Sequence, residues 1–254
     1  MQAHERVTAA IAAATRDGRT ALVPFITAGY PEPAGFAKSL RGIAEVADVV
    51  EIGVPFSDPM ADGMTIQRSS FAAIEKGVTL KWIFSELDSA AVQVPLVMMS
   101  YLNPLLAFGF EALSSRAAAA GVCAFIVPDL PLEESDDLRG ALEQNGLGLI
   151  HLVTPATPAA RLGRLAHASK GFLYAVTVTG ITGGSAGLPP DLAEYLDAVS
   201  AISPLPVCAG FGIRTAADVA SVGRHAAGAI VGSALVETLE KGEDAKSFLR
   251  ALRV

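Results

Sequence analysis

Basic clusters, long apolar runs and cysteines are all scarce in this chain of 254 residues. Lysine and arginine number 19 against 26 aspartates and glutamates, so the formal net charge is −7. Phosphate backbones are bound by clustered cationic side chains, and the lack of such clusters argues against nucleic-acid binding. No apolar run is long enough to span a bilayer. Residues 1–19 mix charge with alanine, unlike the apolar segment of a signal peptide. We expect a soluble cytoplasmic protein that binds neither nucleic acid nor membrane.

Metal-binding and disulfide patterns are also lacking. The two cysteines, Cys123 and Cys208, lie in apolar, strand-like runs and are expected to be small core residues rather than a disulfide pair. The four histidines show no ligand spacing, so no metal site is expected. Only His151 falls in a predicted strand, and we expect it to be an interior residue with its hydrogen bonds satisfied.

The composition favours a large core with many short connections. Hydrophobic residues make up 51% of the chain and charged residues 18%, while 24 glycines and 15 prolines are dispersed along it. This length suits one barrel-sized domain or two small ones.

Short apolar runs alternate with segments of helical spacing. The runs are near-continuously hydrophobic, as in parallel strands covered on both faces. Eight strands are predicted, at 21–27, 48–54, 96–100, 123–128, 147–153, 172–178, 206–209 and 227–231. Helices are predicted at 2–16, 33–47, 110–120, 133–144, 158–168, 190–200, 215–222 and 233–252, with two more pieces between 63 and 95.

The alternation continues without a composition break or a long linker. Eight βα units in this length predict an α/β fold, a single (β/α)8 TIM barrel over residues 1–254 with an extra N-terminal helix. A doubly wound open sheet is the alternative, but eight near-equal units would be many for it.

The stretch VEIGVPFSDPMADG, residues 50–63, places a carboxylate inside an apolar strand and a second one on the loop that follows. If Val50 and Ile52 face the helices, Glu51 faces the barrel interior near its C-terminal mouth, where barrel enzymes carry catalytic groups. Asp62 can fold back over the same mouth. This pattern predicts an acid/base site. The alternative is a buried structural ion-pair partner at Glu51 and a solvated loop residue at Asp62. Asp58, before a proline, reads as a turn residue.

Glycines follow each of the last three predicted strands, at 180–187, 210–212 and 232–233. Glycine lets backbone N–H groups approach an oxyanion, and the late loops of a barrel often hold phosphate. Each pair can equally end a strand or cap a helix. The loop at 180–187 reads either as a mobile lid or as a simple surface loop.

Two further residues lie near this mouth. Asp129 follows strand four and either hydrogen-bonds a neighbouring loop, with the hydroxyl of Thr182 as one partner, or forms a turn. Tyr174 suits a packed core or a substrate wall.

The chain closely resembles the tryptophan synthase alpha subunit family. The stretch 50–63 matches that family's signature around its catalytic carboxylates. Supporting matches are PFITAGYP at 24–31, YLNP at 101–104, PDLP at 128–131, GITG at 180–183, GFGI at 210–213 and GSA at 232–234.

The resemblance implies a lyase that cleaves indole-3-glycerol phosphate to indole and glyceraldehyde 3-phosphate in tryptophan biosynthesis. It implies no cofactor in this chain and a partner beta subunit that uses pyridoxal phosphate, in an alpha2-beta2 complex. Glu51 would be the acid/base and Asp62 would stabilise positive charge on the indole N–H. The substrate pocket would contain Phe25, Met99, Tyr174, Thr182 and Phe211. The phosphate would be held by Gly183, Gly212, Gly232 and Ser233. Thr182 would pair with Asp62 or Asp129 when the lid closes. The surface that meets the partner would include Asp58, Asn103, Asp129 and Pro131.

Two positions depart from the family pattern. Met64 stands where the family usually has proline, and residues 184–187 lack the charged residue that many relatives carry. Two alternative functions stay open from sequence: a free-standing lyase that releases indole, and a weakly catalytic barrel that mainly activates a partner.

Overall fold

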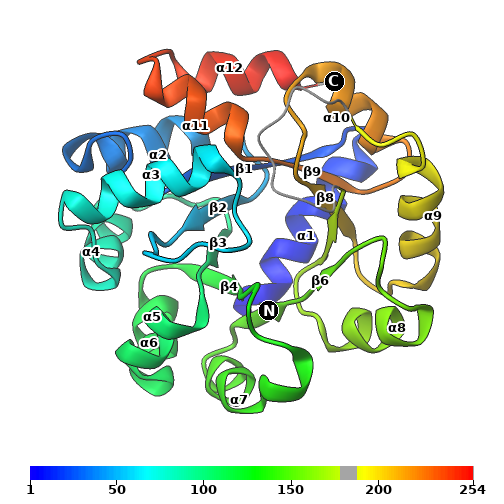
Figure 1. Cartoon of the computed structure of the whole chain (residues 1–254), viewed down its shortest axis with the longest axis horizontal. Coiled ribbons are helices and arrows are strands. Elements are labelled where there is room, and N and C mark those ends of the chain that lie inside the picture. The colour runs from blue at the N-terminus through cyan, green and yellow to red at the C-terminus, as the bar shows by residue number, and fades with distance from the viewer. Residues whose placement is uncertain (178–187, 254) are drawn as a thin grey trace.

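The computed structural model describes residues 1–177 and 188–253, and its strands form a ring enclosed by helices (Figure 1). The strands are β1 (Ala21–Thr27), β2 (Val50–Gly53), β3 (Leu96–Met99), β4 (Val122–Ile126), β5 (Gly148–Ile150), β6 (Leu152–Val153), β7 (Leu173–Val176), β8 (Val207–Gly210) and β9 (Gly228–Val231). All of the paired strands are parallel, in the order β5-β4-β3-β2-β1-β9-β8-β7-β6.

The ring closes at His151. The segments β5 and β6 are the two ends of the sheet, and this single residue separates them in the chain. The first segment pairs with β4 and the second with β7, and the N–H of Tyr174 donates to the carbonyl of His151 at 3.1 Å. The predicted strand at 147–153 is therefore two segments, because the backbone changes partner at its midpoint. The eight-unit barrel is confirmed and the open sheet is wrong.

Helices follow the strands as predicted, with one addition. They are α1 (Ala3–Arg16), α2 (Phe36–Ala44), α3 (Met64–Glu75), α4 (Leu80–Ala90), α5 (Leu102–Phe108), α6 (Phe110–Ala119), α7 (Asp136–Gln144), α8 (Ala159–Ala168), α9 (Leu192–Ile202), α10 (Ala216–Gly223), α11 (Ser233–Glu240) and α12 (Ala245–Leu252). The added one is α5. Its seven residues include a proline and are too few for a clear helical period. No helix in the described ranges is long and apolar enough to cross a membrane.

Alternate strand residues divide the core into two clusters. One cluster lies between the strands and the helices and includes Val50 and Ile52. The other fills the lumen and includes Val49, Phe25 and Tyr174. Because side chains alternate along a strand, Glu51 shares the lumen face with Val49. Both cysteines are buried and free, as expected.

Helix α1 closes the N-terminal mouth of the barrel. Val7 and Ile11 are fully buried in the lumen cluster, and Figure 1 shows α1 lying across the middle of the ring. The hydroxyl of Thr8 donates to the carbonyl of Gly171 before β7, at 2.7 Å. Because α1 closes the N-terminal mouth, the C-terminal mouth is the open end of the barrel.

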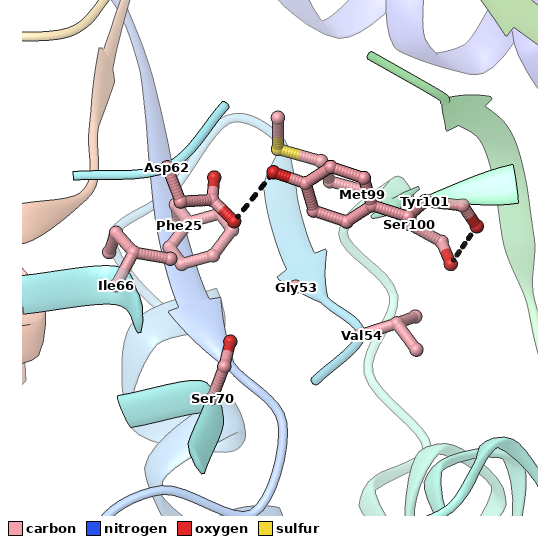
Figure 2. A pocket seen from close by; sticks show the side chains of 9 residues that line it. All are labelled: Phe25, Gly53, Val54, Asp62, Ile66, Ser70, Met99, Ser100 and Tyr101. Atoms are coloured by element: carbon pink, nitrogen blue, oxygen red, sulfur yellow. Dashed lines mark hydrogen bonds between the residues drawn. The ribbon is translucent and has the colours of Figure 1, made fainter. Parts of the chain in front are cut away.

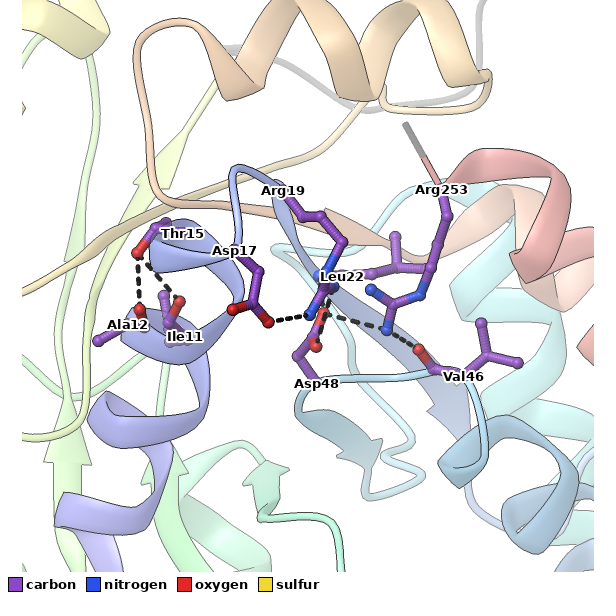
Figure 3. Close-up of polar contacts among 9 residues, drawn as sticks. All are labelled: Ile11, Ala12, Thr15, Asp17, Arg19, Leu22, Val46, Asp48 and Arg253. Carbon is purple, nitrogen blue, oxygen red and sulfur yellow. Dashed lines mark hydrogen bonds and ion pairs between the residues drawn. The ribbon is translucent and has the colours of Figure 1, made fainter.

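Asp48 joins three segments at the closed end (Figure 3). Its carboxylate accepts the N–H of Leu22 at 2.8 Å and lies 3.5 Å from Arg19 and 3.2 Å from Arg253. Arg253 also donates to the carbonyl of Val46. These contacts fix the start of β1, the approach to β2 and the C-terminal segment to one another.

Candidate functional site

Glu51 lies in the barrel lumen on β2. The residue is only 1% exposed, and its register partner on β1 is Phe25. Burial, aided by the nearby charge of Asp62, raises the pKa of Glu51 to about 8. Its Oε2 atom has no hydrogen-bond partner among the residues that the structure describes. A carboxyl group in this setting is protonated near neutral pH and available to an incoming molecule.

Asp62 lies on the loop between β2 and α3. Its N–H donates to the carbonyl of Pro59 at 3.1 Å, and the Gln67 side chain donates to its carbonyl at 2.8 Å, which fixes the backbone. Burial raises the pKa of Asp62 to about 6, against the lowering effect of a hydrogen bond from Tyr101. Asp62 is therefore mostly ionised near neutral pH, unlike Glu51.

Tyr101, directly before α5, is a site residue that sequence reasoning did not single out. Its hydroxyl donates to Asp62 Oδ2 at 3.2 Å and accepts the N–H of Ala61 at 2.8 Å. Its ring stacks on Phe56 with centroids 4.8 Å apart. The motif YLNP after β3 was visible in sequence, but the contact across loops was not.

A pocket beside Asp62 opens at this end of the barrel (Figure 2). Its lining comes from β1, β2, β3, α3 and the segments that follow β2 and β3, and comprises Phe25, Gly53, Val54, Asp62, Ile66, Ser70, Met99, Ser100 and Tyr101. The Phe25 ring lies against Gly53, where an added Cβ would stand 2.3 Å from it. Glycine at position 53 therefore makes room for an aromatic wall. Of the predicted pocket residues, Phe25 and Met99 are both here.

Tyr174, on β7, and Phe211, directly after β8, lie across the lumen. Their ring centroids are 5.9 Å apart. Burial first, and then the charges of Glu51 and Asp62, raise the pKa of Tyr174 well above its usual value. Phe211 has a left-handed backbone, with φ 76°, and the Thr177 hydroxyl donates to its carbonyl. This contact holds a strained residue in place.

The predicted phosphate residues are in part described. Gly212 is exposed and has φ 80°, a conformation that favours glycine. Gly232 precedes α11, and its carbonyl accepts the N–H groups of Leu235 and Val236. The N–H groups of Ser233 and Ala234 come before these bonds, so the helix start presents donors. Thr182 and Gly183 lie outside the described residues.

The four predicted interface residues lie on the outer rim of this mouth. Asp58, Asn103, Asp129 and Pro131 are all exposed. Both oxygens of Asp129 accept the N–H of Leu102, at 2.9 and 3.2 Å, at the start of α5. Asp129 therefore hydrogen-bonds a neighbouring segment, one of its two predicted uses, while its predicted partner Thr182 lies outside the described residues.

The described part of the chain has no grouping of side chains typical of a metal site. Within residues 1–177 and 188–253, no three His, Cys, Asp or Glu side chains cluster as metal ligands would. The lumen instead offers two carboxyl groups whose pKa values lie on either side of neutrality. Such a pair divides acid and base roles between its members.

Comparison with known proteins identifies the family. Residues 11–254 match the family model described as "Tryptophan synthase alpha chain". The tryptophan synthase alpha chain of Nitratidesulfovibrio vulgaris (strain DP4) is 44% identical over 237 residues, which is 92% of each chain. That of Solidesulfovibrio magneticus is 42% identical and covers 97% of this chain and 98% of the relative.

Solved structures agree. A structure of Mycobacterium tuberculosis tryptophan synthase matches with a TM-score of 0.89 and 34% identity, over 97% of this chain and 96% of the other. The alpha subunit from Legionella pneumophila matches with a TM-score of 0.88 and 30% identity, over 99% and 97%. The family signature, the barrel and the paired carboxylates thus converge, and this chain belongs to the tryptophan synthase alpha chain family.

Proposed function

We propose that Glu51 and Asp62 carry out the reaction of this family in this chain, the cleavage of indole-3-glycerol phosphate to indole and glyceraldehyde 3-phosphate. The observation that supports this most is their contrast. Two carboxyl groups belong to the same lumen, and the pKa is about 8 for Glu51 and about 6 for Asp62.

The first step is proton transfer to the indole ring carbon that bears the glycerol chain. Glu51 is protonated near neutral pH and supplies this proton. The ring then carries positive charge, spread toward its N–H. The ionised Asp62 stabilises that charge in a buried setting, so its effect is larger in the transition state than in the ground state.

The second step breaks the carbon–carbon bond. The bonding electrons return to the indole ring, which becomes neutral indole, and the glycerol hydroxyl becomes the aldehyde. Glu51, now a carboxylate, takes the hydroxyl proton and returns to its starting form. The proton gained equals the proton lost, so no other reactant is needed.

The remaining site residues orient the substrate. Phe25, Met99, Tyr174 and Phe211 provide apolar and aromatic walls of the kind that bind a flat indole ring. Gly183, Gly212, Gly232 and Ser233 provide backbone N–H donors for the phosphate. Thr182 is proposed to act when the lid closes.

The catalytic proposal is tested by following indole release from indole-3-glycerol phosphate in Glu51→Gln and Asp62→Asn. Each variant should retain substrate binding while turnover falls about a hundredfold or more, because the proton or the charge is missing. Turnover near that of the wild type in Glu51→Gln would remove the assignment. Brisk indole release by the isolated wild-type chain would exclude the weakly catalytic alternative.

We further propose that the rim binds a beta subunit that carries pyridoxal phosphate, so that indole passes between the two proteins in the cytoplasm. The rim is continuous because Tyr101 forms a hydrogen bond with the 54–63 loop and Asp129 forms one with the start of α5. It also exposes apolar side chains, with Met60 84% and Leu106 51% exposed. Such exposure is typical of a surface that meets a partner.

The partner proposal is tested with Leu106→Asp and a beta subunit from a close relative. The substitution puts a charge into the proposed contact and should weaken binding about tenfold or more. Indole release by the isolated chain should not change, since Leu106 lies outside the pocket. Equal binding by variant and wild type would contradict the proposed surface. Equal turnover with and without the beta subunit would favour the free-standing lyase.

A further inference from the structure

A second cleft lies outside the lumen, between the loop after β4 and the start of α8. Its lining combines apolar side chains with a few polar groups, and includes Val127, Asp129, Leu130, Leu132, His151, Arg161 and Leu165. Of these, Val127, Leu130 and Leu165 belong to the core between strands and helices rather than to the lumen cluster. Leu152 packs against the lumen cluster, but neither Glu51 nor Asp62 lines the cleft.

His151 is the buried polar group of this cleft. The residue is 4% exposed and lies at the junction of β5 and β6, where alternation directs it away from the lumen. Its backbone is held on both sides, by Ser169 Oγ on its N–H at 3.0 Å and by the Tyr174 N–H on its carbonyl. Its Nε2 atom has no partner among the described residues. The expectation that this histidine would be satisfied is therefore wrong, and an imidazole nitrogen is left unpaired at a cleft.

Arg139 and Arg161 both act on this imidazole, although each is paired with a carboxylate, that of Asp136 or Glu133. Arg161 and Arg164 both bind the carboxylate of Glu133, at 2.8 and 3.1 Å, so this group has one positive charge in excess. Burial, and then the charges of Arg139 and Arg161, lower the pKa of His151 to about 4. The ring is thus neutral near neutral pH, yet it sits in a positive field. The one acid in the lining, Asp129, directs both oxygens to the N–H of Leu102.

We propose that this cleft binds a small organic anion, with its carboxylate at His151 Nε2 and Arg161 and its apolar body against Leu130, Leu132 and Leu165. In the tautomer that carries its proton on Nε2, the neutral imidazole donates a hydrogen bond to the carboxylate, and the Arg161 guanidinium attracts the negative charge. The leucines bury the apolar part. The site is independent of the catalytic proposal, since it shares neither Glu51 nor Asp62.

The test uses phenylacetate as the probe and phenylacetamide as its uncharged match, with imidazole nitrogen NMR of the whole chain. Phenylacetate should shift the His151 signals in a saturable way, with phenylacetamide at least about tenfold weaker, which corresponds to about 1.4 kcal/mol. His225, which pairs with Asp197 on the surface at 2.9 Å, should not shift.

Two variants complete the test. Arg161→Gln changes a half-exposed side chain, so it should fold, and it should weaken phenylacetate binding about three- to tenfold. Glu51→Gln should leave this binding unchanged while indole release falls, which separates the cleft from the catalytic site. The proposal is overturned if phenylacetate leaves His151 unshifted, if phenylacetamide binds equally well, or if Arg161→Gln binds as tightly as the wild type.

Discussion

The hydroxyl of Tyr101 binds Asp62 and the backbone beside it at once. It donates to Asp62 Oδ2 at 3.2 Å and accepts the N–H of Ala61 at 2.8 Å. Asp62 lies on the loop after β2 and Tyr101 follows β3, so this contact fixes one loop against its neighbour. The same hydrogen bond lowers the pKa of Asp62, in opposition to burial. Tyr101 is therefore a positioning residue for the aspartate.

Tyr101→Phe should reduce kcat/KM about tenfold near neutral pH, since a hydrogen bond to a charged group is worth roughly 1.5–3 kcal/mol. The pKa of Asp62 should rise above about 6, so the acid limb of the pH profile should move to higher pH. The measurement is kcat/KM for indole release across pH. A purely structural role would lower activity without moving that limb.

Tyr195→Phe is the matched control for Tyr101→Phe. The hydroxyl of Tyr195, on α9, donates to the carbonyl of Val153 at 2.9 Å, and Tyr195 is not part of the carboxylate pocket. Its loss should cost stability of about 1 kcal/mol and leave the pH profile in place. An equal shift in both variants would show that the effect is not specific to Asp62.

The wild-type profile of kcat/KM against pH should be bell-shaped. Activity needs Asp62 ionised and Glu51 protonated, so it should rise through about 6 and fall through about 8. Because the two groups interact, these values belong to the pair rather than to either residue alone. The expected maximum lies between them. A profile without a fall on the alkaline side would contradict the role of Glu51 as proton donor.

Glu51→Gln should stabilise the fold while it removes activity. The pKa of Glu51 is about 8 in the folded chain against an ordinary value of 4.5. Between these values the unfolded carboxyl is ionised and the folded one is protonated, so wild-type stability falls as pH rises through this window. Glutamine does not titrate. The gain in the free energy of unfolding should therefore grow with pH and exceed about 1 kcal/mol at its alkaline end. Denaturant unfolding of both proteins at several pH values measures it.

Local pattern predicts most of the barrel. Near-continuous apolar runs located the strands, and glycine and proline located most helix ends. The alternation of Val50, Glu51 and Ile52 indicated which side chain enters the lumen, because a strand has a strict period of two. The resemblance to the family then indicated which carboxylates and which pocket walls to expect.

Features that depend on contacts across the barrel were not predicted. The short helix α5 takes its first-turn acceptor from Asp129, which is distant in sequence. The interruption at His151 arises where the chain stops pairing with β4 and begins to pair with β7. Tyr101 acquires its role only when two loops meet. None of these has a periodic signal within its own segment.

Asp48→Ala should destabilise the barrel by about 1–3 kcal/mol without lowering kcat/KM. The substitution leaves the N–H of Leu22 without its acceptor and removes one of the partners of Arg19 and of Arg253 (Figure 3). All of these groups lie at the closed end of the barrel, far from Glu51 and Asp62. Thermal unfolding and steady-state kinetics measure the two effects. Asp17→Ala is the control, since the side chain of Asp17 is 66% exposed and its ion pair with Arg19 should contribute little.

Met64→Pro should restore the family pattern and stiffen the Asp62 loop. Met64 is the first residue of α3 and is 60% exposed, and proline is well tolerated at this position because its missing N–H has no intrahelical acceptor. Gly63 before it is extended, with ψ 162°, as a residue before proline prefers. The variant should gain about 0.4–1 kcal/mol in the free energy of unfolding, through the lower entropy of the unfolded chain. KM should be unchanged or lower, because Asp62 is better held. Loss of stability would mean that the backbone at Met64 cannot accept a proline ring.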